Sequence, residues 1–301
     1  MTRILHYSQE VERARATRTP IVALETTILS HGMPFPRNLE TARDIERAVR
    51  GAGAVPATIA VLGGRIHVGL DDAQLAHIAQ APMLKAGRSD LAYALATNAD
   101  AATTVAATVH CAALAGIAVF ATGGIGGVHR GVAQTMDVSG DLDAIASSPV
   151  AVVCAGAKAI LDLPKTLEAL ETRGVPVVGY RTSEFPAFWS RSSGLRLAQR
   201  LDTPAAVAAL VRAQTALGLR SGIVVANPIA AEHEIPAAEM ERYIADAVAA
   251  AAAARIGGKE LSPWLLDRLL TSTAHKSLDA NVALVLSNAA LAAEIAIALA
   301  S

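Results

Sequence analysis

The sequence predicts an α/β protein with a three-layer α/β/α architecture, in which helices cover both faces of a mainly parallel central sheet. Two observations predict this fold: short apolar runs alternate with longer amphipathic ones up to about residue 236, and the chain after that point is almost wholly helical. No Pro/Ser-rich linker, charge block or internal repeat divides the chain. We therefore expect a single domain over residues 1–301, with a helical C-terminal segment that wraps the sheet.

The individual elements follow from run length, periodicity and capping residues. Six apolar runs have the length of buried strands, at 20–24, 57–62, 116–122, 150–155, 175–180 and 222–227. Helices are predicted at 38–51, 71–80, 89–97, 103–114, 163–173 and 203–217, and the closing segment at 237–255, 260–273 and 278–300. Pro164 and Gly174 lie at the start and end of one helix, and Asp202-Thr203-Pro204 opens the next.

Composition and charge narrow the class of protein. The 301 residues are 52% hydrophobic, which excludes intrinsic disorder as the main state. Lys and Arg total 26 against 27 Asp and Glu, so electrostatic binding to nucleic acid is not expected. The uncharged stretch 101–128 is long enough to span a membrane, but its threonines, His110 and Gly116 favour a buried helix, a strand and a glycine loop. With no secretory signal apparent and two cysteines in apolar surroundings, we expect a cytoplasmic protein with reduced thiols.

Reactive residue types follow several predicted strands, and the carboxyl ends of parallel strands are where ligands bind. Glu25 follows the first strand, Thr122 ends the third and is followed by a glycine-rich loop, and Lys158 follows the fourth. A buried Lys158 would have the uncharged amine that a nucleophile toward a sugar carbon requires, although its stem could instead pack while its head reaches water. Glu25 could act as a general acid or base, or could cap the following turn.

Two further segments could bind an anion or a metal. The loop TGGIGGVHRG at 122–131 offers backbone N–H groups for a phosphate, but it could equally be a plain tight connection. Asp137, Ser139 and Asp141 place oxygen side chains at alternate positions, which suits a hard divalent cation. The alternative for this segment is an Asx/Ser turn that caps a helix at 141–147.

Together these motifs resemble the pseudouridine-5'-phosphate glycosidase family, also called pseudouridylate synthase or the indigoidine synthase A-like family. The resemblance runs in order from about residue 20 to 285. The segments that carry it are VALETTILSHGMPFPRNLETA, GGRIHVGL, KAGRSDLAYA, ATTVAAT, FATGGIGGVHRG, DVSGDL, CAGAKAILDLPKTLEALET, GVPVVGYRTSEFPAFW, ANPI and NVAL.

The resemblance implies reversible cleavage of the carbon–carbon glycosidic bond of pseudouridine 5'-phosphate, giving uracil and ribose 5-phosphate, with a divalent cation, usually Mn²⁺. On this likeness Lys158 is the nucleophile that forms a Schiff-base-type adduct with the ring-opened sugar, Glu25 is the proton donor, and Asp137 binds the metal. The positions implied to bind substrate are Lys85, Val105, Thr122, His129, Ser139, Gly140, Asp141 and Asn281. The family likeness also implies a homotrimer and a role in pseudouridine breakdown.

The chemistry of C-glycoside cleavage independently supports the roles of Lys158 and Glu25. Because the leaving atom of a C-glycoside is carbon, protonation of an exocyclic heteroatom cannot release it. An amine on the anomeric carbon can instead stabilise positive charge as an iminium, while an acid delivers a proton to the base carbon. Two other functions stay open on the sequence: a sugar or nucleoside kinase, although no P-loop lysine is present, and a non-catalytic sugar-phosphate-binding protein on a similar fold.

Overall fold

A computed structural model describes residues 4–301, so the first three residues of the predicted domain lie outside it. The strands form one mixed, mostly parallel sheet with the order β1-β4-β3-β2-β7-β8-β11-β9-β10, while β6 pairs with β3 and β5. Only β4 and β6 run antiparallel to their neighbour β3 within the described chain. The strand bounds are β1 Leu5–Tyr7, β2 Ile21–Leu24, β3 Val55–Leu62, β4 Arg65–Val68, β5 Leu84–Ala86, β6 Ala101–Thr103, β7 Val119–Ala121, β8 Ala151–Cys154, β9 Val177–Tyr180, β10 Gln199–Leu201 and β11 Ile223–Ala226.

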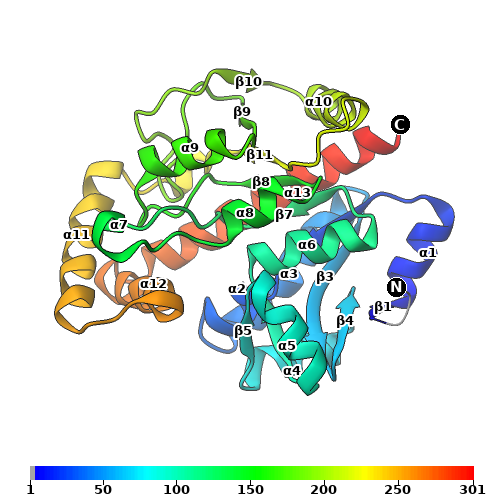
Figure 1. The fold of residues 1–301 in the computed structure, drawn as a ribbon, viewed down its shortest axis with the longest axis horizontal. Coiled ribbons are helices and arrows are strands. Elements are labelled where there is room, and N and C mark those ends of the chain that lie inside the picture. Colours follow the sequence, from blue (N-terminus) through cyan, green and yellow to red (C-terminus); the bar gives the residue numbers. More distant parts are fainter. Residues whose placement is uncertain (1–3) are drawn as a thin grey trace.

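Helices cover both faces of this sheet, as the sequence predicts (Figure 1). On one face α13 packs against β2, β7 and β8, with α3 and α10 beside it; on the other face α6 packs against β2, β3 and β7. The helix bounds are α1 Gln9–Thr17, α2 Thr27–His31, α3 Arg37–Gly51, α4 Asp72–Gln80, α5 Leu91–Thr97, α6 Val105–Ala115, α7 Val132–Thr135, α8 Asp141–Ala146, α9 Leu163–Thr172, α10 Pro204–Ala216, α11 Ala237–Ala253, α12 Leu261–Ser272 and α13 Lys276–Ala300.

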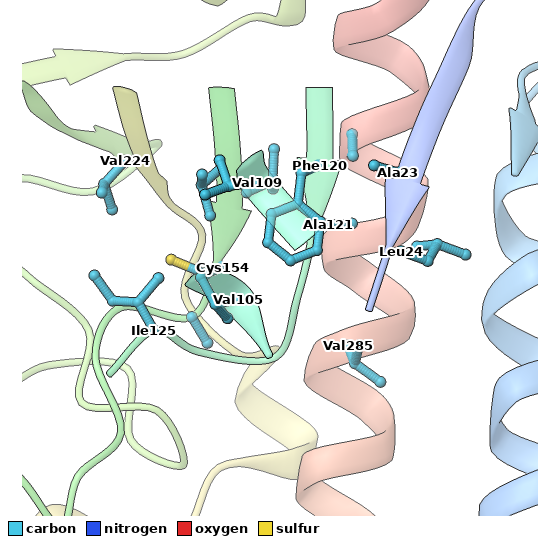
Figure 2. Close-up of a cluster of buried hydrophobic side chains, with 14 of the residues drawn as sticks. Ala23, Leu24, Val105, Val109, Phe120, Ala121, Ile125, Cys154, Val224 and Val285 are labelled. Atoms are coloured by element: carbon cyan, nitrogen blue, oxygen red, sulfur yellow. The ribbon is translucent and has the colours of Figure 1, made fainter. Parts of the chain in front are cut away.

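The core lies between the central strands and these two helix layers. Figure 2 shows Phe120 of β7 among side chains of β2, β8, β11, α6 and α13. The Phe120 side chain is fully buried, and truncating such a ring to alanine costs about 3–5 kcal/mol. Cys111 and Cys154 are buried free thiols, as predicted, and burial raises the pKa of each to about 12. Neither thiol is therefore a nucleophile at neutral pH.

The helix α13 is the one helix of residues 4–301 that is long and apolar enough to cross a membrane by length and composition. Of its most apolar 18-residue stretch, 56% is buried inside the protein, where it packs on the sheet. Its apolar composition is therefore explained by its place in the core. The stretch 101–128 forms β6, α6, β7 and the start of the glycine loop, which confirms the interpretation made from its sequence.

All six predicted strands and all nine predicted helices are present, with ends displaced by a few residues. The helix predicted from residue 103 begins at Val105, because Thr103 ends β6 and Thr104 caps the helix by accepting a hydrogen bond from the Ala107 N–H. The helices α9 and α10 begin as predicted, with proline in the first turn after Asp162 and Thr203. Five short strands and four helices escaped prediction, namely β1, β4, β5, β6, β10, α1, α2, α7 and α8, although a helix at 141–147 was the alternative weighed for the segment that forms α8.

Candidate active site

A cavity of about 680 Å³ opens at the carboxyl ends of β2, β7 and β8. All eleven residues that the sequence analysis singled out line it, although they come from segments as far apart as β2 and α13. They are Glu25, Lys85, Val105, Thr122, His129, Asp137, Ser139, Gly140, Asp141, Lys158 and Asn281. The fold therefore gathers these residues in one place, and their individual roles remain predictions.

Glu25 and Thr122 directly follow the neighbouring strands β2 and β7, and their side chains meet. The Thr122 hydroxyl donates a hydrogen bond to Glu25 Oε1 at 2.5 Å. Burial raises the pKa of Glu25, and the nearby Asp141 carboxylate acts in the same direction, while the positive charge of Lys158, the Thr122 hydrogen bond and Lys85 oppose it. The helix α2 that follows Glu25 has Thr26 at its N-cap and no side-chain capping bond. The alternative in which Glu25 caps the next turn is therefore wrong.

Lys158 lies in the turn after β8 and brings an amine to the same cavity as Glu25. Its backbone N–H donates to the Ile125 carbonyl at 3.1 Å, which ties this turn to the glycine loop. Its side chain is half-buried and lines the cavity. Lys85, on β5, is half-buried and lines the cavity as well. Two cationic side chains thus lie along a wall that also carries acidic groups.

The glycine loop packs closely against neighbouring residues, and two of its N–H groups are already hydrogen-bonded within the protein. A Cβ at Gly124 would lie 2.5 Å from the Phe188 ring, and one at Gly126 would lie 2.2 Å from Ser139 Oγ. The N–H groups of Ile125 and Gly126 already donate to the Gly156 carbonyl and to Asp141 Oδ2. These donors are not available to a phosphate, so the tight-connection interpretation accounts for this part of the loop.

His129 and Asp137 form the next part of the wall. The backbone N–H of His129 donates to the Asp137 carbonyl at 3.0 Å, and His129 Nδ1 lies 3.9 Å from Asp137 Oδ2. Burial lowers the pKa of His129, and the positive charges of Lys158 and Lys85 lower it further, against the opposing effect of Asp137. The imidazole is therefore favoured in its neutral form, while the Asp137 carboxylate, 28% exposed, faces the cavity.

Asp141 begins α8, and its carboxylate is bonded to the protein itself. Oδ1 accepts the Ala106 N–H at 2.9 Å, and Oδ2 accepts the Gly126 N–H at 2.7 Å. The Ser139 hydroxyl accepts the Asp141 N–H at 3.2 Å, so the turn-and-helix interpretation of this segment is realised. Asp141 thus joins the start of α6 to the glycine loop. Gly140, which lies between Ser139 and Asp141, is exposed.

Asn281 of α13 and Phe188, from the loop after β9, line the cavity beside Gly123. The Asn281 Oδ1 atom is buried and has no hydrogen-bond partner among the groups that the structure describes. An unsatisfied buried acceptor costs about 1–3 kcal/mol, so a donor from a bound molecule is expected there. Sequence reasoning missed Phe188, which lines the cavity, and also Ser262, Pro263 and Leu266 of α12, which line it too.

Comparison with known proteins identifies the family of the chain. Residues 10–298 match the family described as indigoidine synthase A like protein. The chain belongs to this family. A relative from Methylobacterium nodulans, named pseudouridine-5'-phosphate glycosidase, is 59% identical over 98% of this chain and 88% of its own length. A relative of the same name from Paracoccus denitrificans is 56% identical over the full length of both chains.

Two solved structures share the fold over nearly the whole chain. An indigoidine synthase A-like protein from Thermotoga maritima superposes with a TM-score of 0.90 at 36% identity, covering 99% of this chain and 97% of its own. The prealnumycin C-glycosynthase AlnA, solved in complex with ribulose 5-phosphate, gives a TM-score of 0.91 at 39% identity over the same shares. The three-layer α/β/α arrangement is therefore shared with another indigoidine synthase A-like protein and with an enzyme named as a C-glycosynthase.

Proposed function

We propose that this protein reversibly cleaves the carbon–carbon glycosidic bond of pseudouridine 5'-phosphate to give uracil and ribose 5-phosphate. The observation that carries the proposal is the pairing of a half-buried amine, Lys158, with a carboxyl group whose pKa is raised by burial, Glu25, in one cavity. The relatives at 56–59% identity, both named pseudouridine-5'-phosphate glycosidase, support it. None of the relatives described above bears the name of a kinase or of a non-catalytic binding protein.

In the cleavage direction, the Lys158 amine adds to C1' of the sugar. The C1'–O4' bond breaks, and O4' takes the proton that the amine loses, so the sugar ring opens. The C1'–C5 bond then breaks with its electron pair going to the base, and C5 receives a proton. The remaining C1' is an iminium with Lys158 Nζ, which water hydrolyses to ribose 5-phosphate and the free amine.

Glu25 is the group proposed to supply the proton to C5. Burial favours its protonated form, which is the form a proton donor needs, and Thr122 fixes the orientation of its carboxyl group. In the reverse direction the same carboxylate takes the proton from uracil. Asn281 Oδ1, the buried acceptor without a partner, is suited to receive an N–H of the pyrimidine.

A divalent cation such as Mn²⁺ would be held by Asp137. Within residues 4–301 no group of three or more His, Cys, Asp or Glu side chains is placed to hold a metal ion. One partly exposed carboxylate fits a hard cation that keeps most of its water. When bound, the ion supplies positive charge against the anionic substrate. Lys85, Ser139 and His129 lie in the same cavity and are the proposed groups for contacts with the sugar phosphate.

We propose that the protein forms a homotrimer. We also propose that it acts in the cytoplasm. Several large apolar side chains are exposed on the single chain, among them Met136 at 81% and Leu217 at 74%. Such side chains are suited to burial between subunits. Light scattering during gel filtration measures the number of subunits directly.

The proposed reaction is tested by incubating the protein with uracil, ribose 5-phosphate and Mn²⁺ and following pseudouridine 5'-phosphate by chromatography. Lys158→Arg is the matched control, because it keeps the positive charge but cannot form the iminium. Product from the wild type and none from the variant is the expected result. Absence of product in both directions of reaction, with several divalent ions, would refute the proposed function.

A further inference from the structure

Phe188 occupies an unusual position for a large aromatic residue. It is 2% exposed and lines the cavity, yet its backbone lies in the left-handed region with φ of 60°. Such a conformation is strained for a bulky side chain; it persists only where the surrounding structure fixes it, and it clusters at functional sites. The proposed mechanism gives Phe188 no task.

The contacts that fix Phe188 reach across the fold. Its N–H donates to the Ala155 carbonyl at 3.0 Å, at the end of β8. Its ring meets the Trp189 ring edge to face, with centroids 4.8 Å apart, and the Trp189 indole N–H donates to the Ser277 carbonyl of α13 at 2.9 Å. The position of the Phe188 ring is thereby linked to α13, the helix that carries Asn281 one turn further along.

The glycine loop is built to receive this ring. A Cβ at Gly124 would lie 2.5 Å from Phe188 Cδ2, and one at Gly123 would lie 3.5 Å from Phe188 Cε2 and 3.2 Å from Asn281 Oδ1. The two glycines, the Phe188 ring and the Asn281 amide therefore lie together. We call this group of four residues the aromatic end of the cavity.

We propose that Phe188 is a specificity-determining residue that binds the pyrimidine ring of the substrate at the aromatic end. This inference rests on the proposed function. A pyrimidine is a flat ring with an apolar face and a polar edge, which matches an aromatic side chain next to an unpaired amide oxygen. A sugar phosphate carries hydroxyl groups and charge, which the cations and carboxylates along the rest of the wall suit better.

The test separates base binding from sugar-phosphate binding. KM is measured for uracil and for ribose 5-phosphate separately, in the direction of synthesis, for the wild type, Phe188→Leu and Phe188→Ala. Equilibrium binding of pseudouridine 5'-phosphate and of ribose 5-phosphate is measured by calorimetry on the same proteins. The matched control is Phe185→Leu, since Phe185 is a fully buried ring of the same loop that does not line the cavity.

Phe188→Ala is expected to raise KM for uracil about 5- to 100-fold, the range for losing an aromatic contact to a base, with KM for ribose 5-phosphate little changed. Phe188→Leu should give a smaller change in the same direction, and Phe185→Leu should move neither KM. Equal effects on both KM values, or no effect, would overturn the inference while leaving the function intact. If the wild type makes no product but Phe188→Ala selectively weakens binding of pseudouridine 5'-phosphate, the function fails and the inference stands. Binding of neither ligand by any of the proteins would overturn both.

Discussion

The Asp141 carboxylate joins two parts of the candidate active site, so removing it is expected to destabilise the protein as well as to impair the proposed reaction. Its two oxygens accept the Ala106 N–H at the start of α6 and the Gly126 N–H of the glycine loop. The side chain is 6% exposed, so water cannot readily replace it. Asp141→Ala would leave both N–H groups buried without an acceptor, whereas Asp141→Asn would keep one acceptor oxygen for two donors.

The size of the effect follows from these two bonds. A hydrogen bond to a charged group contributes about 1.5–3 kcal/mol, so Asp141→Ala is expected to lower the free energy of unfolding by about 3–6 kcal/mol. Asp141→Asn should lose about half of that, since one of the two N–H groups keeps a partner. At about 2 °C per kcal/mol for a chain of this length, the alanine variant should melt about 6–12 °C below the wild type.

The assay is urea denaturation followed by circular dichroism, with Asp143→Asn as the control on the same helix. Asp143 is 69% exposed and pairs with Arg173, an exposed type of ion pair that contributes about 1 kcal/mol or less. Because the Asp141 charge also helps to raise the pKa of Glu25, Asp141→Asn should move the alkaline limb of kcat/KM to lower pH. An Asp141→Ala protein as stable as Asp143→Asn would refute the role given to these two bonds.

Four further predictions concern the proposed chemistry and the burial of Glu25. Glu25→Gln should reduce kcat about 10²- to 10⁴-fold. Because the pKa of Glu25 is raised above its ordinary 4.5, the folded wild type holds a proton that the unfolded chain releases, so its stability falls as pH rises from 4.5 through the raised pKa. The stability of Glu25→Gln relative to the wild type should therefore increase with pH in denaturant titrations, and a constant difference would contradict the burial argument. Borohydride added during turnover should attach the reduced sugar phosphate to Lys158, detected by peptide mass spectrometry, and a label on another lysine would reassign the nucleophile. Asp137→Asn should raise the Mn²⁺ concentration needed for half-maximal activity, whereas an unchanged titration would place the metal elsewhere.

The central strands could be predicted because both of their faces are buried, so each reads as an unbroken apolar run. The strands β2, β8 and β11 show this most clearly, since nearly every residue in them is buried. The missed strands are three or four residues long, and β1 and β10 are edge strands with half-buried or exposed side chains. Such strands form because a neighbour supplies hydrogen bonds, which is information that a short local sequence does not contain.

The cavity residues that follow strands were predictable for a simple geometric reason. Parallel strands end at one edge of a sheet, so Glu25, Thr122 and Lys158 had to approach one another. Phe188 could not be found this way, because its place depends on the Trp189 bond to Ser277, 88 residues away in the sequence. The alternate spacing of Asp137, Ser139 and Asp141 suggested a cation site or a turn that caps a helix, but spacing could not reveal that the Ala106 and Gly126 N–H groups donate to both oxygens of Asp141.

Burial and the Lys158 charge have opposite effects on the pKa of Glu25, and this opposition would help the proposed reaction to run in both directions. A group that gives a proton in cleavage and takes one in synthesis works best when its pKa is near the working pH. Burial alone would hold Glu25 protonated and make it a poor base, while the Lys158 charge alone would hold it ionised and make it a poor acid. Because burial and the Lys158 charge act on the same carboxyl group, its pKa lies between the values that each would give alone. In this arrangement Lys158, the proposed nucleophile, also lowers the pKa of Glu25, the proposed proton donor, so Lys158→Ala should raise the pKa of Glu25 further as well as remove the proposed covalent step.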